Sequence, residues 1–332
     1  MSSPRLLLVT PGFHGYWRSI ASALSRRGYA VTTHLYDHRT ARGKVRHKVV
    51  HELPARMGLP RATDNRPTQA AVGRIAQERP DVLLVVKGDE LGPDFWSAAA
   101  GIPRRALWLY DEIRRTSHSA ATLEAAGPIA SYSPADVEDL TNRGLEALHV
   151  PLGHDQHLAP TPVGPLEEVA FIGARYPKRE SLLTTLHAAG VPVRAYGRDW
   201  SGHPLDRART WRVGAPSLPA ERDLDRESAY GVMAGATVSL NIHGDQDGFT
   251  MRTFEVPGVG GLELIDRREV SRYYEPGKEL LTFDTGEQAI DLCRRAMVDR
   301  SWAQAIREAG RARTLAEHTM DHRAAALETL WA

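Results

Sequence analysis

The feature that most constrains this chain is a repeated alternation of short apolar runs with stretches long enough for a helix. Six such runs occur in the first half, at residues 6–10, 30–36, 82–87, 105–109, 129–131 and 148–151. Each run is apolar on both faces, which is typical of a strand buried in a parallel sheet. Parallel neighbours need a crossover connection, and the intervening stretches have helical length. The first half therefore predicts a doubly wound α/β domain.

The same alternation resumes after a segment rich in proline and glycine. Pro160, Pro162, Gly164 and Pro165 lie close together, and such residues interrupt both helices and strand ladders. Beyond this linker we expect strands at residues 168–172, 193–196, 238–242, 262–265 and 280–282, with helices over 179–189 and 226–233. This pattern predicts a second parallel sheet, and residues 286–332 have a largely helical pattern.

The charge balance and the single cysteine limit the partners and the compartment that we expect. Lys and Arg total 42 against 41 Asp and Glu, so the net charge of +1 provides no field that attracts nucleic acid or an anionic membrane. Basic residues concentrate in residues 38–58, which we interpret as a solvated face. Cys293 is the only cysteine, which excludes an internal disulfide and favours a cytoplasmic location. The apolar run at residues 5–9 is too short to cross a membrane.

The turn after the first apolar run has part of the pattern of a dinucleotide-binding loop. Gly12 and Gly15 precede an amphipathic helix, and Asp37 follows about 20 residues later. The first tight-turn glycine is missing, however, and aromatic side chains fill positions where a pyrophosphate needs bare backbone. An NAD(P)-dependent oxidoreductase that uses this loop stays open as an alternative function.

Residues 235–266 carry the most informative pattern in the chain. They read as strand, loop, short helix, glycine turn and strand, with Asp247 directly before Gly248 and Phe249 and with a helix expected to start near Thr250. A helix start presents unpaired backbone N–H groups and the positive end of a dipole, which suits a diphosphate. Glu255 follows about two turns later, and an ionised carboxylate can accept both hydroxyls of a ribose.

This stretch resembles the donor-binding signature of group-1 glycosyltransferases, and is closer still to their spore-maturation, CgeB-like branch. The motifs of that branch occur here as Leu240-Asn241-Ile242-His243 and Arg252-Thr253-Phe254-Glu255. Further pieces fall in the same order, namely Pro151-Leu152-Gly153, Phe171-Ile172-Gly173, Tyr196-Gly197-Arg198, Tyr274-Glu275-Pro276-Gly277 and Glu317-His318-Thr319. The resemblance covers roughly residues 128–330. Asp247 stands where the wider superfamily usually has Glu, which is one methylene longer.

The resemblance implies the GT-B fold, in which two Rossmann-like doubly wound domains face each other across a cleft. We expect an acceptor-side domain over residues 1–155, a nucleotide-sugar domain over 166–315, and a C-terminal helix over 316–332 that packs back on the first domain. It also implies a donor site on the second domain, formed by Arg179, Gly197, Trp200, His243, Asp247, Gly248, Phe249, Thr250, Arg252 and Glu255. A fixed cation such as Arg179 can stabilise the leaving diphosphate, so we expect no metal ion and no bound cofactor.

The acceptor side is expected on the first domain, in the loop that contains Gly12, Phe13 and Tyr16. His14 lies where inverting enzymes of this fold keep a general base, and histidine suits that role because its ordinary pKa is about 6.5. Packing against the following helix is an equally good interpretation of His14. Asp111 and Glu112 follow a strand, and either can bind acceptor hydroxyls, act as the base, or form a satisfied strand-end pair.

The sequence therefore predicts a metal-independent glycosyltransferase, more narrowly a hexosyl- or deoxyhexosyltransferase. It is expected to use a nucleotide-diphosphate sugar and a small-molecule or peptide-like acceptor. A degenerate protein that binds sugar nucleotides without transferring the sugar is a second alternative. The sequence indicates neither the sugar, the nucleobase and the stereochemical outcome nor the oligomeric state.

Overall fold

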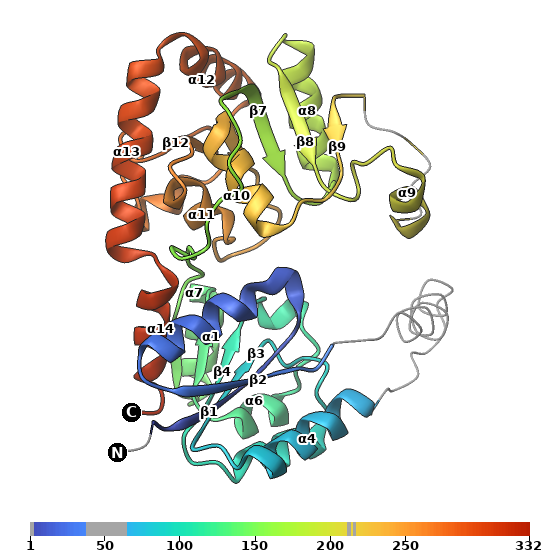
Figure 1. Ribbon diagram of the computed structural model, residues 1–332, viewed down its shortest axis with the longest axis vertical. Coiled ribbons are helices and arrows are strands. Elements are labelled where there is room, and N and C mark those ends of the chain that lie inside the picture. The colour runs from blue at the N-terminus through green and yellow to red at the C-terminus, as the bar shows by residue number, and fades with distance from the viewer. Residues whose placement is uncertain (1–2, 38–64, 211–213, 215–216) are drawn as a thin grey trace. The chain divides into compact units, whose positions relative to one another are not determined.

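The computed structural model describes residues 3–37, 65–210, 214 and 217–332, and these residues form two compact units. Unit 1 contains the chain up to Pro151 together with Ala324–Ala332, and unit 2 contains Leu152–Arg323 (Figure 1). The basic stretch at residues 38–58 lies outside the described residues. No helix in the described ranges is long and apolar enough to cross a membrane.

Unit 1 is built on a parallel sheet of six strands in the order β2-β1-β3-β4-β5-β6. The strands are β1 (Arg5–Thr10), β2 (Ala30–Leu35), β3 (Val82–Val86), β4 (Arg105–Leu109), β5 (Ile129–Ser131) and β6 (Ala147–His149). The helices are α1 (Tyr16–Arg26), α4 (Arg66–Glu78), α5 (Pro93–Ala100), α6 (Ala120–Ala126) and α7 (Pro134–Asn142). Side chains of α4, α5 and α6 share one core with alternate residues of β1, β3 and β4, while α1 lies on the other face (Figure 1).

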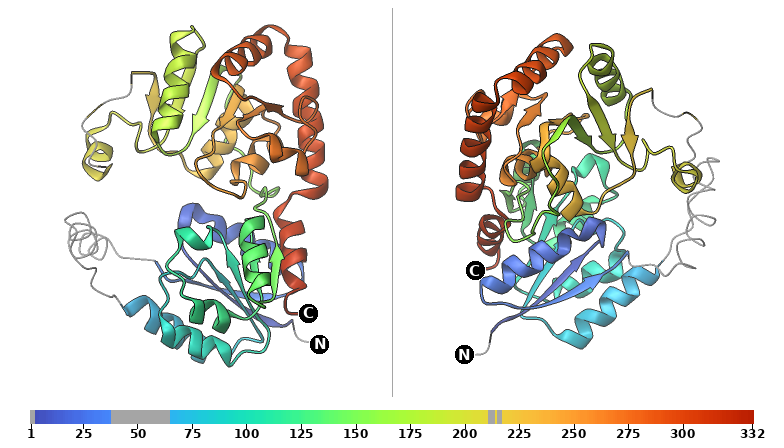
Figure 2. Two further views of the ribbon diagram at one scale, coloured as in Figure 1. Left: turned by 180° about the vertical axis from the view of Figure 1, so that it is seen from behind. Right: turned by 45° about the horizontal axis from the view of Figure 1, so that its top comes forward.

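Unit 2 contains a second parallel six-stranded sheet, in the order β12-β11-β10-β7-β8-β9. Its strands are β7 (Leu166–Ile172), β8 (Val193–Tyr196), β9 (Ala220–Glu221), β10 (Ala236–Asn241), β11 (Glu263–Ile265) and β12 (Leu281–Thr282). Its helices are α8 (Pro177–Ala188), α9 (Pro204–Thr210), α10 (Arg226–Gly235), α11 (Arg252–Gly258), α12 (Gly286–Val298) and α13 (Arg300–Glu317). Helix α14 (Met320–Glu328) begins in unit 2, and its residues from Ala324 onward belong to unit 1. Residues of α8 and α12 pack in one cluster, and residues of α10 and α11 pack in another (Figure 2).

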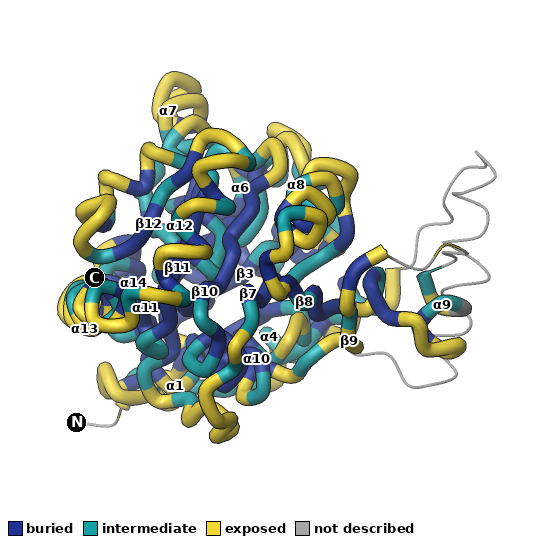
Figure 3. The backbone as a smooth tube through the Cα atoms, turned by 90° about the horizontal axis from the view of Figure 1, so that it is seen from above, coloured by how far each residue is buried: buried dark blue, intermediate teal, exposed yellow. Residues whose placement is uncertain are grey.

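The sequence pattern explains most of these elements. The central strands β3 and β10 are buried almost throughout (Figure 3), whereas the outer strands β2 and β6 are only partly buried. Helix α1 buries Ile20, Ala23 and Leu24 on one face, as the spacing of its apolar residues predicts. The prediction of two doubly wound α/β domains is confirmed. The two-residue strand β9 was not predicted, because so short an edge strand has no periodic pattern to read.

Each sheet reverses its winding direction at one point. In unit 2 the reversal lies between β7 and β10, and the order matches the Rossmann arrangement of two halves wound in opposite directions. In unit 1 it lies between β1 and β3. Helices on opposite faces leave the strands there, so their loops part and open a crevice beyond the carboxyl ends of the strands. These two crevices are where ligand-binding residues are expected.

The end of the chain contributes to unit 1. The side chain of Glu328 accepts hydrogen bonds from Arg27 and, at 2.9 Å, from the Tyr29 hydroxyl. The indole of Trp331 donates to the same hydroxyl at 3.0 Å, and the carbonyl of Trp331 accepts from Arg104 at 3.0 Å. The last residues are therefore part of the packing of unit 1.

Candidate functional site

Arg179 lies at the reversal point of the unit 2 sheet. It is in the first turn of α8, directly after the loop that leaves β7. Its Nε donates to the carbonyl of Ile242 at 2.8 Å, and its Nη1 donates to the carbonyl of Ala174 at 3.1 Å. The guanidinium therefore joins the loops that leave β7 and β10. Burial lowers the pKa of Arg179 from its ordinary value. Arginine nevertheless stays protonated in proteins, so the group is a fixed cation.

A close approach between two glycines shapes the neighbouring loop. Gly197 has a φ of +154°, and a Cβ atom on it would lie 2.7 Å from the carbonyl oxygen of Gly173. The indole of Trp200 donates to that same oxygen at 2.8 Å. Trp200 is fully buried, with Phe171 against its ring, so it supports the loop after β7 and has no exposed face for a nucleobase.

His243 follows β10 and is held on both ring nitrogens. Its Nε2 accepts from the backbone N–H of Thr250 at 3.4 Å, and its Nδ1 lies 3.2 Å from a carboxylate oxygen of Asp266. Burial lowers the pKa of His243 despite the carboxylate, so the neutral ring with its proton on Nδ1 fits both contacts. Burial acts to raise the pKa of Asp266, but hydrogen bonds from His243 and Lys178 keep it below its ordinary value. The Lys178 ammonium lies 2.6 Å from Asp266.

Arg267 holds the loop that contains the Asp-Gly-Phe motif. Its Nη1 donates to the carbonyls of Gln246, Asp247 and Gly248 at 3.0, 2.8 and 3.2 Å. Its guanidinium also lies over the ring of Phe249, 4.3 Å from the centroid. The sequence analysis missed Asp266 and Arg267. An Asp-Arg pair directly after the apolar run that becomes β11 was the available signal, because polar residues at strand ends face the crevice.

Glu255 lies in a buried polar cluster on α11. The helix begins at Arg252, later than the expected start near Thr250, and ends at Gly258 as expected. The side chain of Glu255 is fully buried, accepts from the Tyr230 hydroxyl at 3.3 Å and pairs with Arg252. Arg252 is 27% exposed, so it forms the outer boundary of this cluster. The structure thus places Glu255 beneath Arg252 and not on an open surface.

Unit 1 places the Gly12 loop at the carboxyl end of β1. The backbone N–H of Gly12 donates to Asp37 at 2.6 Å. Asp37 is the acid that the dinucleotide interpretation assigns to a ribose, so this contact and the aromatic loop do not favour that alternative. Phe13 is 49% exposed and its ring stacks on Tyr16 at 5.7 Å. His14 is exposed and has a φ of +42°, which is unusual for a residue other than glycine.

Lys87 follows β3 on the other side of the same crevice and was not selected from the sequence. Its φ is +62°, and its ammonium lies 3.6 Å from Asp89 and 3.9 Å from Asp111. The turn is held in this conformation because the carbonyl of Lys87 accepts from His118 Nε2 at 2.7 Å. Strained backbone of this kind clusters at functional sites. A Lys-Gly-Asp sequence directly after a buried strand was the signal that was available.

Asp111 and Glu112 have different surroundings at the end of β4. Asp111 accepts from Arg115 at 2.9 Å, and its side chain is 26% exposed. Glu112 has a side chain that is only 2% exposed; it accepts from Arg114 at 2.7 Å and from the Tyr132 hydroxyl at 3.5 Å. Glu112 is therefore occupied by internal partners, and Asp111 is the more accessible carboxylate of the two.

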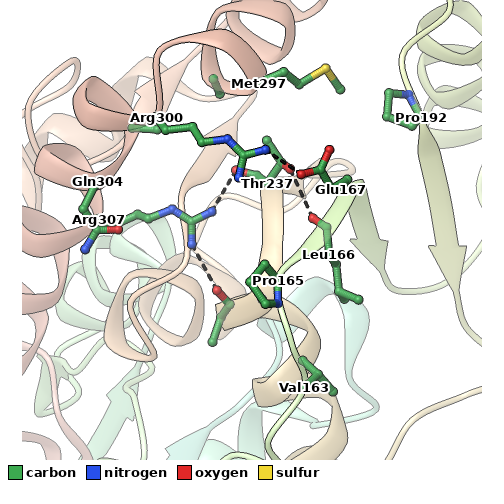
Figure 4. Close-up of a pocket in the computed structure, with 14 residues that line it drawn as sticks. Val163, Pro165, Leu166, Glu167, Pro192, Thr237, Met297, Arg300, Gln304 and Arg307 are labelled. Atoms are coloured by element: carbon green, nitrogen blue, oxygen red, sulfur yellow. Dashed lines mark hydrogen bonds and ion pairs between the residues drawn. The ribbon is translucent and has the colours of Figure 1, made fainter.

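A cavity of about 490 Å³ lies elsewhere in unit 2, beside the first residues of β7 and β10 (Figure 4). Arg307 lines it (Figure 4), but its guanidinium donates to the carbonyls of Ala234, Ala236, Thr237 and Gly260. Arg300 pairs with Glu167 at 2.5 Å. The cavity is thus at the opposite edge of the sheet from the reversal-point crevice. Among the described residues, no three His, Cys, Asp or Glu side chains are grouped to hold a metal ion.

Comparisons with known proteins concern part of the sequence and the fold. Residues 178–329 match the sequence model of a family described as Glycosyl transferase-like. No curated protein matches the chain. The structure is similar to sucrose-phosphate synthase from Thermosynechococcus elongatus, with a TM-score of 0.64 and 13% identity over 99% of this chain and 98% of that one.

Two further solved structures contain a sugar nucleotide. HepE from Anabaena in complex with UDP-glucose has a TM-score of 0.63 and 12% identity, covering 98% of this chain and 99% of that one. T4 phage BGT in complex with its UDP-glucose substrate has a TM-score of 0.60 and 12% identity, covering 98% of each chain. Likeness at such low identity concerns the fold, which is the GT-B fold of glycosyltransferases, as expected from the sequence.

Proposed function

We propose that this protein is a glycosyltransferase that moves a sugar from a nucleotide-diphosphate donor to an acceptor hydroxyl. The observation that carries the proposal is Arg179, a fixed cation that joins the loops after β7 and β10 at the reversal point of the unit 2 sheet. That crevice is where open parallel sheets bind ligands, and a diphosphate there meets a positive charge. The match of residues 178–329 to a glycosyltransferase family adds independent support.

We assign the remaining donor contacts to residues at the same edge of the unit 2 sheet, beyond the carboxyl ends of its strands. We assign the diphosphate to Arg179 and to the loop between His243 and Thr250, and the nucleoside ribose to Glu255. The two oxygens of an ionised carboxylate offer about four acceptor sites, so Glu255 can accept ribose hydroxyls when Arg252 moves outward. Gly197 and Trp200 support the loop after β7, because both lie against the carbonyl oxygen of Gly173. Asp247 is assigned to the transferred sugar, for which a hexose or deoxyhexose is the natural candidate in this family.

The acceptor is assigned to unit 1. In the proposed step the acceptor oxygen forms a bond to the anomeric carbon of the sugar while the bond from that carbon to the diphosphate breaks. The acceptor proton passes to a base, for which we propose His14 in an inverting reaction, with Asp111 as the next candidate. Lys87 and Asp89 can orient acceptor hydroxyls, because a sugar-like hydroxyl both donates and accepts hydrogen bonds. Phe13 and Tyr16 provide the aromatic wall, and Gly12 fixes the turn before them.

A metal ion is not needed in this scheme, because Arg179 and the loop amides carry the charge of the leaving diphosphate. The acceptor is a small molecule or a peptide-like group, and the CgeB-like branch is the family assignment that the motifs favour. These finer assignments, and a cytoplasmic location, are parts of the proposal.

A nucleotide panel tests the proposal directly. UDP, GDP, dTDP, NAD⁺ and NADP⁺ are compared for their effect on the melting temperature, since a ligand of the folded state stabilises it by mass action. We expect one of the three nucleoside diphosphates to raise the melting temperature in the presence of EDTA. A response to NAD⁺ or NADP⁺ alone would overturn the proposal. Mass spectrometry of products with the matching sugar nucleotide then separates a transferase from a protein that only binds the donor.

A further inference from the structure

Glu263 is a buried carboxyl group that the proposed reaction does not use. It is the first residue of β11, and the residue is only 1% exposed. Its Oε1 accepts from the side-chain amide of Asn241 at 2.7 Å, and its Oε2 has no hydrogen-bond partner among the described residues. A charged carboxylate in such a place is costly, because neither a cation nor a second donor compensates for lost hydration.

The surroundings favour the neutral form of this group. Burial raises the pKa of Glu263 to about 8, against a smaller opposing effect of the Asn241 hydrogen bond. The elements packed on β11 carry Glu255 and Arg252 on α11 and His243 after β10. Glu255 pairs with Arg252, and His243 contacts Asp266 and Thr250. Tyr274 also lies near: its pKa is raised by burial and further by Glu263, and its hydroxyl pairs with Thr314 at 2.8 Å.

Asn241 connects Glu263 to the start of α11. Its Nδ2 donates both to Glu263 and to the Thr253 hydroxyl, the latter at 3.0 Å. Because both N–H groups of the amide are used in this way, its Oδ1 faces the Thr250 hydroxyl, which donates to it at 3.4 Å. The backbone N–H of Thr250 is the one that donates to His243. One buried amide thus fixes Thr250, at the end of the loop assigned to the diphosphate, and Thr253, in the first turn of α11.

We propose that Glu263 is a positioning residue for the donor site, which in its neutral, protonated form holds Asn241 and thereby fixes Thr250 and Thr253 at the start of α11. Ionisation of Glu263 weakens this hold, because a charge without a counterion favours states in which α11 separates from β11 and water reaches the carboxylate. The inference rests on the proposed function, because the loop in question is the one assigned to the nucleotide diphosphate.

The direction of the pH effect follows from linkage. In the closed state Glu263 keeps its proton up to about pH 8, whereas in a hydrated, open state it loses the proton near its ordinary value of 4.5. Opening therefore releases one proton between these values and becomes easier by about tenfold for each pH unit, and it levels off above pH 8. The closed state, in which α11 packs on β11, is therefore most stable below pH 4.5 and becomes less stable as the pH rises.

Hydrogen exchange of the full-length protein measures this opening without a ligand. The protection factors of the Thr250 and Thr253 amides, corrected for intrinsic exchange, are compared at pH 5 to 8 in the wild type, Glu263→Gln and Glu221→Gln. Glu221 is a matched control, because it is an exposed carboxylate on β9 that pairs with Arg194. We expect protection to fall with pH in the wild type and in Glu221→Gln, and to be flat in Glu263→Gln. A flat profile in the wild type overturns the inference.

Donor affinity provides the second measurement. Calorimetry with the nucleoside diphosphate selected by the panel should show that binding to the wild type weakens between pH 6 and 8 relative to Glu263→Gln. Glu263→Leu, which gives Asn241 no acceptor, should bind more weakly than Glu263→Gln at every pH. Equal affinity of these two variants at all pH values contradicts the positioning role. If the wild type binds no nucleotide at any of the pH values, the result contradicts the proposed function instead. The exchange experiment still tests the role of Glu263 in that case.

Discussion

Replacement of Arg179 by Met tests the residue on which the proposed donor site depends. The substitution removes the only side chain that we find bonded to both Ile242 and Ala174 in the described part of the chain. Each of those carbonyls loses one hydrogen-bond partner, which costs about 1 to 3 kcal/mol when the group stays dry. Arg179 is half-buried, so water can replace part of each bond. We therefore expect Arg179→Met to lower the free energy of unfolding by about 1 to 3 kcal/mol in total.

The effect on the donor should be separable from this loss of stability. A hydrogen bond to a charged group contributes about 1.5 to 3 kcal/mol, so the affinity for a nucleoside diphosphate should fall about ten- to a hundredfold. The affinity for the parent nucleoside, which lacks the diphosphate, should stay unchanged. Calorimetry with both ligands, at a temperature where the variant is fully folded, measures the two values.

Lys178→Met is the matched control for Arg179→Met. Lys178 is the preceding residue, and its side chain is 63% exposed and paired with Asp266. The Lys178 ammonium is bonded to Asp266, whose side chain is only 6% exposed, and it is not assigned to the diphosphate, so Lys178→Met should lower diphosphate affinity less than Arg179→Met does. The reasoning is refuted if Arg179→Met binds the diphosphate as the wild type does, or if nucleoside and diphosphate lose the same factor. If Lys178→Met loses more diphosphate affinity than Arg179→Met does, the diphosphate binds nearer to Lys178 and Asp266 than to Arg179.

Three other substitutions, one of them with a matched control, test the remaining assignments. Glu255→Gln should weaken donor binding by about 1.5 to 3 kcal/mol, measured by calorimetry, and unchanged affinity would show that the ribose binds elsewhere. His14→Ala should leave nucleotide binding unchanged and lower turnover by about two to four orders of magnitude, whereas a retaining product or near-normal turnover would leave His14 a packing residue. Gly197→Ala should lower the free energy of unfolding in urea by about 1 to 3 kcal/mol, because its Cβ would lie 2.7 Å from the Gly173 oxygen. Gly202→Ala, where a Cβ meets nothing within 4 Å, should be neutral.

The sequence by itself predicted the two parallel sheets and the stretch that we propose as the donor site. Alternation of apolar runs with helical stretches is a local property, so it could be read without knowing which strands pair. The stretch from His243 to Glu255 was found in the same way, because its residues are close in sequence. The edge strand β9 escaped detection, since two residues carry no period.

Only the tertiary structure decided which distant residues meet. The strand order brings the loop after β7 beside the loop after β10, and this is why Arg179 reaches Ile242 across 63 positions of sequence. The same folding brings Asp37 to the Gly12 amide, and among the described residues it provides the Glu263 side chain with one hydrogen bond, from Asn241. Hydrogen bonding and burial depend on neighbours that the fold supplies, and no pattern within one segment of this sequence specifies them.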